Sequence, residues 1–439
     1  MKKMDTGFSS ARATSWHAFW KRRHRQILLL ATVLIVVVAA VWIGYQGWRL
    51  VFQPVPEGAI DLKLRFRETT RWFNSKPVYG VRPDAVYPPA SYLLFKPFID
   101  YGSLAVARWI WAVVTLISLF VLCRSFARES GAEGAIEKRF ITLLPLALYP
   151  VGATIGNGQV GLLIAMCMLI AIPMLREERR SLSRDGLIAL LMLLALIKPS
   201  LSAFFFLIVF FAPGGWRPAT ITVVLYTVAT YLASLPQKPG PYRLLVEWKN
   251  RSKAGTIYGA RFGEGAIIDP ERVPHHLPPP AQERIAEQME RGVVIKSVNL
   301  HSLISYFGSP KWSMLGSTIL LAFFAAWMFY RRKASVWTLA GVTGIVAIFS
   351  GYHAWYDHVI LVFPLLILFR LARVERSTSS GVLFALLSLS LLAPGGVYAF
   401  PKDMVMWSNT YVVLQTVVFL AVLVHLVRQA GREHRAVQA

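Results

Sequence analysis

The sequence predicts an all-α polytopic membrane protein, and three observations lead to this fold class. Hydrophobic residues make up 55% of the 439 residues, whereas charged residues make up only 16%. The apolar residues are gathered in long runs, and a helix of about 20 apolar residues crosses the hydrocarbon core of a bilayer. Much of the formal net charge of +24 lies between these runs, where a membrane protein carries its basic loops. We therefore expect about twelve transmembrane helices.

The first apolar run extends from Gln26 to Val51, after a polar segment that ends in a basic cluster. The run is longer than the apolar region of a signal peptide and has no clear small-residue cleavage site, so we interpret it as a retained helix. Residues 1–25 then form a cytoplasmic basic segment. The later apolar runs lie at 102–123, 140–156, 158–175, 185–197, 199–213, 218–236, 313–330, 335–353, 358–373, 381–396 and 409–427.

The short loops between the runs predict the orientation, because cytoplasmic loops carry an excess of Lys and Arg. A cytoplasmic amino terminus places every basic short loop on the cytoplasmic side. These loops contain Arg124, Arg128, Lys138, Arg139, Arg176, Arg179, Arg180, Arg184, Arg217, Arg331, Arg332, Lys333, Arg370, Arg373 and Arg376. Residues 26–427 are expected to form one transmembrane domain, and residues 428–439 a cytoplasmic tail.

Two long loops, 52–101 and 237–312, then face outward, and long loops often carry function. Both contain patterns of short amphipathic helices. In the first loop, one helical face carries Leu62, Phe66, Thr69 and Phe73. In the second loop, the pattern consists of Leu300, Leu303, Ile304 and Phe307 after Asn299, with a polar helix at 281–291. We expect these segments to lie on the bilayer surface.

Asp61 follows the first apolar run by about ten residues and has two interpretations. An aspartate at the start of an amphipathic helix is a good N-cap, because its carboxylate accepts hydrogen bonds from free backbone amides. A carboxylate held at the bilayer surface can also act as a general base that takes the proton of an acceptor hydroxyl. Both interpretations remain open from the residues alone.

Basic side chains could hold a phosphate near this carboxylate. Arg65 and Arg67 follow Asp61 directly, and guanidinium groups bind phosphate well. Lys198 lies in an apolar stretch beside Pro199, where an ionisable group is costly and is by default a candidate functional residue. The alternative is that Lys198 extends its ammonium group toward an interface. Further basic candidates are Arg71, Lys96, Lys249, Arg251 and Arg261.

The stretch 350–358 begins the tenth run with a cluster of aromatic and polar residues. His353 and Asp357 have the i, i+4 spacing of a metal-binding pair, but no third ligand follows, and we expect neither a metal nor another cofactor. His358 could donate a hydrogen bond to phosphate or substrate. Gln159 lies in a polar turn. This turn either only connects two apolar segments or contacts sugar hydroxyls.

Several functions are disfavoured by the sequence. It has no Walker loop, no dinucleotide fingerprint and no zincin pattern, which argues against nucleotide-driven chemistry. The basic residues are divided among many loops and do not form a nucleic-acid surface. A transporter or lipid flippase is the main alternative to an enzyme, since a broken helix pair near Lys198 also suits alternating access. A polymerase or ligase of surface glycans is a further alternative.

Several short motifs together resemble glycosyltransferase family 87, whose members have the C-type glycosyltransferase fold. The likeness extends over most of residues 26–427, and its weight comes from the order of the motifs. They are Asp61 after the first helix, Pro77-Val78-Tyr79, Tyr87-Pro88-Pro89, Gly158-Gln159-Val160, Leu196-Ile197-Lys198-Pro199, Asn299 near Ser302-Leu303, and Trp355 to His358. One departure is Asp357-His358, where many relatives have paired histidines.

The resemblance implies transfer of a sugar, mannose by expectation, from a polyprenyl-phosphate donor to a glycolipid or glycan acceptor. It places the reaction at the outer face of a bacterial cytoplasmic membrane. It also implies that Asp61 is the base and that the anomeric carbon is inverted. The substrate or the lipid phosphate is then expected to contact Lys198, His358, Arg65, Arg67, Tyr87, Gln159 and Asn299.

Overall fold

A computed structural model describes residues 8–54, 57–79, 85–176, 181–258, 298–299, 311–351, 353–395, 400 and 404–438. These residues form 16 α-helices and one 3-10 helix, and no strand occurs among them. The helices are α1 (Phe8–Val51), α2 (Ile60–Phe73), α3 (Pro89–Ile99), α4 (Leu104–Glu129), α5 (Ala135–Ala147), α6 (Tyr149–Asn157), α7 (Gly161–Met174), α8 (Leu182–Ala195), α9 (Pro199–Phe211), α10 (Trp216–Ser234), α11 (Pro241–Tyr258), α14 (Lys311–Arg331), α15 (Val336–Ser350), η3 (Trp355–Leu361), α16 (Val362–Val374), α17 (Thr378–Leu392) and α19 (Val405–Gln438).

The two long loops contain more helix than the sequence predicts. The amphipathic segment of the first loop is helical, as expected, and forms α2. The same loop also contains α3, which begins at Pro89, a residue whose fixed φ suits the first turn of a helix. The second loop begins with α11, which the sequence analysis missed. The helices expected at 281–291 and 300–307 lie outside the described residues.

Three helices are long and apolar enough to cross a membrane by themselves. They are Arg25–Val51, Leu104–Glu129 and Met406–Val437, and a fourth span is formed if α5 and α6, bent by 46°, are taken together. Pro145 near the end of α5 and extended Leu148 after it account for this bend. The chain is therefore a helical membrane protein. The expected twelve crossings remain a prediction, since several apolar helices, such as α7 and α9, are shorter.

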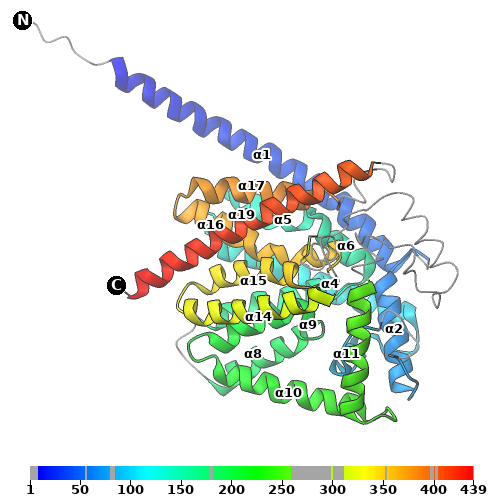
Figure 1. Cartoon of the computed structure of the whole chain (residues 1–439). Helices are drawn as coiled ribbons and strands as arrows, with labels where there is room; N and C mark the ends of the chain where they lie inside the picture. Colours follow the sequence, from blue (N-terminus) through cyan, green and yellow to red (C-terminus); the bar gives the residue numbers. More distant parts are fainter. Residues whose placement is uncertain are drawn as a thin grey trace, which may run out of the picture.

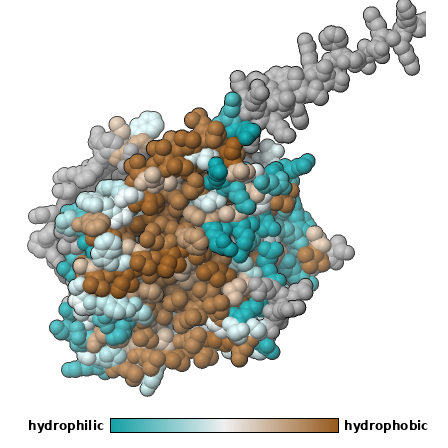
Figure 2. All heavy atoms as spheres, turned by 180° about the vertical axis from the view of Figure 1, so that it is seen from behind, coloured by the Kyte–Doolittle hydropathy of each residue, from teal (hydrophilic) through white to brown (hydrophobic). Residues whose placement is uncertain are grey.

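The surface of the helical bundle is apolar enough to lie in contact with lipid. The face shown in Figure 2 carries a broad apolar band with hydrophilic side chains beside it. Large apolar side chains of α1 and α4 are strongly exposed, among them Leu30 at 71%, Val41 at 69% and Phe120 at 67%. Exposed apolar patches of this extent would be unstable in water but favourable against lipid tails.

Polar contacts join the ends of the helices at two opposite ends of the bundle. At one end, Glu129 of α4 accepts a hydrogen bond from Trp337 Nε1 of α15 at 3.0 Å and lies 3.7 Å from Arg370 of α16. We call this the charged end. At the other, Arg49 near the end of α1 donates a hydrogen bond to Asn157 of α6. The start of α1 and the end of α19 lie on the side of the charged end, whereas α2 and α11 lie on the opposite side (Figure 1).

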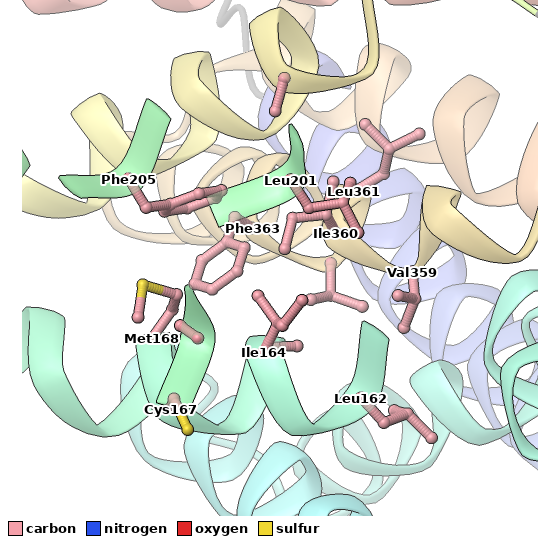
Figure 3. Close-up of a cluster of buried hydrophobic side chains, with 14 of the residues drawn as sticks. Leu162, Ile164, Cys167, Met168, Leu201, Phe205, Val359, Ile360, Leu361 and Phe363 are labelled. Carbon is pink, nitrogen blue, oxygen red and sulfur yellow. The ribbon is translucent and has the colours of Figure 1, made fainter. Parts of the chain in front are cut away.

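An apolar core lies between α7, α9 and the segment that contains η3 and α16. Figure 3 shows Ile164 and Met168 of α7 facing Leu201 and Phe205 of α9, with Ile360 and Phe363 between these two helices. The rings of Phe205 and Phe363 are 4.9 Å apart. Because this core fixes the start of α9 against η3, it positions the polar residues at the adjoining end of the bundle.

Candidate active site

Asp61 lies in the first turn of α2 and does not cap it. The residue before the helix is Ala59, which is in the left-handed region at φ 49°, and no side-chain cap hydrogen bond is formed. The N-cap interpretation of Asp61 is therefore wrong. The carboxylate is free to serve a contact away from its own helix.

The turn before Asp61 is fixed by its surroundings. The Ala59 amide donates a hydrogen bond to the Gly156 carbonyl of α6 at 3.2 Å. Gly58 lies so close to the chain that an added Cβ would be 2.3 Å from the Gln53 carbonyl oxygen. A larger residue does not fit there, which explains why the turn uses glycine. This close approach of the turn to α6 directs Asp61 toward the following residue pair, Gly158 and Gln159.

Asp61 meets polar groups from three other parts of the chain. The Gln159 side chain hydrogen-bonds the carboxylate, and the charges of Arg65, Lys198 and Asp357 act on it. Burial raises the pKa of Asp61 above its usual value of 3.8, more than Gln159, Arg65 and Lys198 lower it. A carboxylate with a raised pKa is a stronger base than an ordinary aspartate when it is ionised.

Lys198 and Asp357 form an ion pair within this cluster. Lys198 Nζ lies 2.6 Å from Asp357 Oδ1 and 2.8 Å from Oδ2, and both side chains are largely buried. Lys198 directly precedes α9, and Asp357 is in the first turn of η3. Burial opposes ionisation of Asp357, but the nearby ammonium group outweighs it and lowers the pKa of Asp357 to about 2. Lys198 is thus held inside the protein and does not extend to an interface.

The two histidines near Asp357 have different surroundings. His353 Nδ1 lies 3.3 Å from Asp357 Oδ2. His358 is 1% exposed, packs against the rings of Trp355 and Phe419, and has no hydrogen-bond partner among the described residues. Within the described part of the chain, no group of three or more His, Cys, Asp or Glu side chains is arranged to hold a metal ion.

A second buried ion pair supports the cluster from within α2. Arg65 Nη1 donates to Glu68 Oε2 at 2.7 Å, and the two side chains are 7% and 0% exposed. The Arg65 guanidinium also lies over the Tyr87 ring, 4.5 Å from its centroid. Tyr87 is fixed in turn, because the Tyr79 hydroxyl donates to its carbonyl oxygen at 2.8 Å. Arg65 is thus positioned beside Asp61 by partners on two sides.

The buried face of α2 is held against α3 and α10. Trp72 is fully buried, stacks on Tyr92 of α3 at 4.5 Å and donates its indole hydrogen to the Ala233 carbonyl of α10 at 2.6 Å. Gln237 donates back to the Trp72 carbonyl at 2.5 Å. Stacked aromatic side chains with satisfied polar tips make a rigid contact. The helix that carries Asp61 and Arg65 is therefore part of the folded bundle.

Five of the eight expected site residues are brought together by the structure, namely Asp61, Arg65, Tyr87, Gln159 and Lys198. His358 directly follows Asp357 of this cluster, and Asn299 is fully buried. Arg67 has an exposed side chain on the other side of α2, away from buried Arg65. Two further basic candidates also have other contacts: Lys96 pairs with Asp100 at 2.9 Å, and Arg71 donates to the Pro77 carbonyl.

Asp357 and Glu68 are the charged partners that the sequence analysis did not identify. The sequence spacing relates Asp357 to His353 as a metal-binding pair, but its ion-pair partner Lys198 lies 159 positions earlier in the chain. No local pattern reveals such a contact. Glu68 could have been found, because Arg65 and Glu68 have the i, i+3 spacing of a helical ion pair.

The arrangement combines one strong base with two cations that already have partners. Among the described residues no ion pair is found for Asp61, whereas Glu68 pairs with Arg65 and Asp357 pairs with Lys198. The buried residues around them reduce the local dielectric, which strengthens each electrostatic interaction. The cluster can therefore accept a proton and place positive charge near a developing anion.

Comparison with known proteins finds one matching family. The model of glycosyltransferase family 87 matches residues 85–257, a range that contains Tyr87, Gln159 and Lys198. Asp61, Arg65 and Asp357 lie outside that range and reach the same place through the fold. No curated protein and no solved structure matches the chain significantly. The matched segment and the helical membrane architecture together support membership of glycosyltransferase family 87, a family of enzymes that transfer sugar.

Proposed function

We propose that this enzyme moves a sugar from a polyprenyl-phosphate donor to a hydroxyl of a glycolipid or glycan, with Asp61 as the general base. The observation that carries this proposal is the position of Asp61. Its carboxylate is partly buried, its pKa is raised, and it lies in one polar cluster with the cations Arg65 and Lys198. A base and a site for a departing anion are the two groups that such a transfer requires.

In the proposed reaction, every bond formed or broken and the transferred proton are accounted for. The acceptor hydroxyl oxygen forms a bond to the anomeric carbon of the sugar while Asp61 takes the hydroxyl proton. The bond between the anomeric carbon and the phosphate oxygen breaks, and the electron pair leaves with the lipid phosphate. Attack from the side opposite the leaving group inverts the anomeric carbon. The proton on Asp61 then passes to water, which restores the base.

The donor phosphate would bind to Lys198 and Arg65, each of which is already paired with a carboxylate. Lys198 is paired with Asp357 and lies close to Tyr87. Arg65 reaches the same cluster from α2 and lies over the Tyr87 ring. A cation that is held by a carboxylate is preorganised, so it needs little rearrangement as negative charge develops on the leaving phosphate. We propose that Lys198 contacts this phosphate and that Asp357 positions Lys198. We propose His358, Gln159 and Asn299 as further contacts for substrate.

The remaining features of the proposal concern the membrane. We propose that the chain crosses it about twelve times and that the amino terminus and the charged end face the cytoplasm. The cluster around Asp61 would then face outward from a bacterial cytoplasmic membrane. Its position just after α1 supports a location near one bilayer surface, where a lipid-linked sugar presents its phosphate. Mannose is the sugar that we expect it to transfer.

The test is a transfer assay with radiolabelled polyprenyl-phosphate mannose in membranes that contain wild-type protein or Asp61→Asn at matched levels. We expect Asp61→Asn to lower the transfer rate by about 10²- to 10⁴-fold, the usual contribution of a general base. Asp100→Asn is the matched control, because Asp100 lies in the same loop but pairs with Lys96 at the surface. This control should retain wild-type activity.

Three results would contradict the proposal in different ways. Equal transfer by wild type and Asp61→Asn would remove Asp61 from the mechanism. Activity with another lipid-linked sugar but none with the mannose donor would correct the sugar only. Movement of labelled lipid across sealed vesicles without a covalent product would instead support a transporter.

A further inference from the structure

A cavity of about 640 Å³ lies at the charged end, far from Asp61. It is formed where α1 enters the bundle, between the start of α5 and the end of α16. Its lining includes Arg25, Leu28, Glu137, Phe369, Ala372 and Arg373. The candidate span of α1 begins at Arg25 and ends at Val51, close to the other end of the bundle. At 1.5 Å per residue, this span is about 40 Å long, so the cavity is separate from the candidate active site.

The cavity has an apolar part and a charged part. Leu28, Phe369 and Ala372 supply apolar surface, whereas Arg25 and Arg373 supply guanidinium groups and Glu137 supplies a carboxylate. Arg373 is oriented by two carboxylates, since it lies 2.8 Å from Glu133 and 3.0 Å from Glu137. Arg25 has an exposed side chain, and no ion pair with a carboxylate is found for it among the described residues. One arginine is thus held in place, and the other is available for a ligand.

The position of the cavity along α1 indicates what would fill it. Arg25 is the first residue of a candidate membrane span. When that span crosses a bilayer, the guanidinium group lies at the level of the lipid headgroups. The next turns of the same helix expose large apolar side chains, including Ile27 at 62% and Leu30 at 71%. A molecule in the cavity would therefore have its polar part beside Arg25 and an apolar part along α1.

We propose that this cavity binds an anionic phospholipid, with its phosphate at Arg25 and one acyl chain against Leu28 and the exposed face of α1. Guanidinium groups form strong paired hydrogen bonds with phosphate oxygens. Apolar lining continuous with a lipid-facing helix favours a lipid over free phosphate, which has no apolar part to bury. The proposal depends on the membrane position of α1 and is independent of the chemistry proposed for Asp61.

The test measures binding of two lipids to the purified full-length protein by native mass spectrometry. Phosphatidylglycerol and phosphatidylcholine of identical acyl chains are compared for wild type, Arg25→Gln and Arg139→Gln. We expect wild type to prefer phosphatidylglycerol and Arg25→Gln to bind it about tenfold more weakly, which corresponds to one lost charge-assisted contact. Arg139 is an exposed arginine at the same end of the bundle but outside the cavity, so its variant should bind like wild type.

A second variant tests the cavity itself. Ala372→Phe fills part of the space and removes no charge, so it should also weaken phosphatidylglycerol binding while sugar transfer is unchanged. Equal binding of both lipids by wild type would overturn the proposal, as would equal losses in Arg25→Gln and Arg139→Gln. Displacement of the lipid by millimolar inorganic phosphate would show that the site takes free phosphate instead.

Discussion

At the scale of single residues, the balance of burial and charge at Asp61 determines its chemistry. Burial raises the pKa of Asp61, while Gln159, Arg65 and Lys198 lower it and Asp357 raises it further. The net pKa lies above 3.8, so the residue is a better proton acceptor than a solvated aspartate. Because the charged form is disfavoured by burial, each neighbour that stabilises it has a measurable effect on the pH dependence of transfer.

The first prediction concerns this pH dependence. In the proposed mechanism only ionised Asp61 takes the acceptor proton, so we expect activity to fall as pH decreases through its pKa, which is raised above 3.8. Replacement of Gln159 by Leu removes a hydrogen bond that stabilises the ionised form. We expect the acid limb of the kcat/KM profile to move to higher pH in Gln159→Leu. An acid limb at the same pH in both proteins would contradict the role of Asp61.

The second prediction concerns the buried pair Arg65 and Glu68. Glu68→Gln leaves the Arg65 charge buried without its carboxylate, and removal of one partner of a buried pair costs about 3–5 kcal/mol. Thermal unfolding of the purified protein should therefore occur at a clearly lower temperature. The control is Asp100→Ala, which breaks the more exposed pair with Lys96 and should change stability by about 1 kcal/mol at most. Equal effects of the two changes would contradict the structural role of Glu68.

At the scale of helices, the site is assembled from element ends. Asp61 is in the first turn of α2, Gln159 precedes α7, Lys198 precedes α9 and Asp357 begins η3. A lysine at the start of a helix faces the positive end of the helix dipole, which is unfavourable. Asp357 offsets this cost, and the packed core shown in Figure 3 keeps the two segments together. The Lys198–Asp357 contact thus connects α9 to η3.

The third prediction tests this connection by a double-mutant cycle. Lys198→Met and Asp357→Asn should each destabilise the protein, because each leaves a buried charge without its partner. The double variant should lose less stability than the sum of the two single losses, by about 0.5–3 kcal/mol. Thermal unfolding in detergent gives all four values. Additive losses would show that the two side chains do not interact in the folded protein.

At the scale of the whole molecule, the two ends of the bundle differ in charge and in content. The charged end contains the arginine-rich helix ends and the cavity beside Arg25, whereas the opposite end contains the cluster around Asp61. Long α1 extends from one end to the other (Figure 1). The positive-inside rule then predicts that the charged end faces the cytoplasm.

The fourth prediction follows from this orientation. A single cysteine placed at exposed Lys76, in the loop that follows α2, should react with a membrane-impermeant thiol reagent on intact cells. A cysteine placed at exposed Arg139 should react only after the membrane is broken. Both variants are made with natural Cys123 and Cys167 replaced by alanine. Labelling of the Arg139 position on intact cells would reverse the proposed orientation.

The sequence by itself determined the class of this protein. Runs of apolar residues require an apolar surrounding, so the helical membrane architecture and the helix at Asp61 could be predicted from local patterns. The same patterns identified Asp61, Lys198 and Gln159 as candidates, because polar residues beside apolar helices are costly. Local patterns also failed where a helix lacked a strong apolar period, as in α11.

Only the tertiary structure decided how these residues meet. The pairing of Lys198 with Asp357, the contact of Gln159 with Asp61 and the cavity beside Arg25 each join segments far apart in the chain. Such contacts depend on helix packing, which many different sequences of similar hydropathy satisfy equally well. The left-handed Ala59, which excludes an N-cap role for Asp61, depends in turn on its hydrogen bond to α6. Periodicity records which face of a helix is apolar, but packing alone determines which helix that face meets.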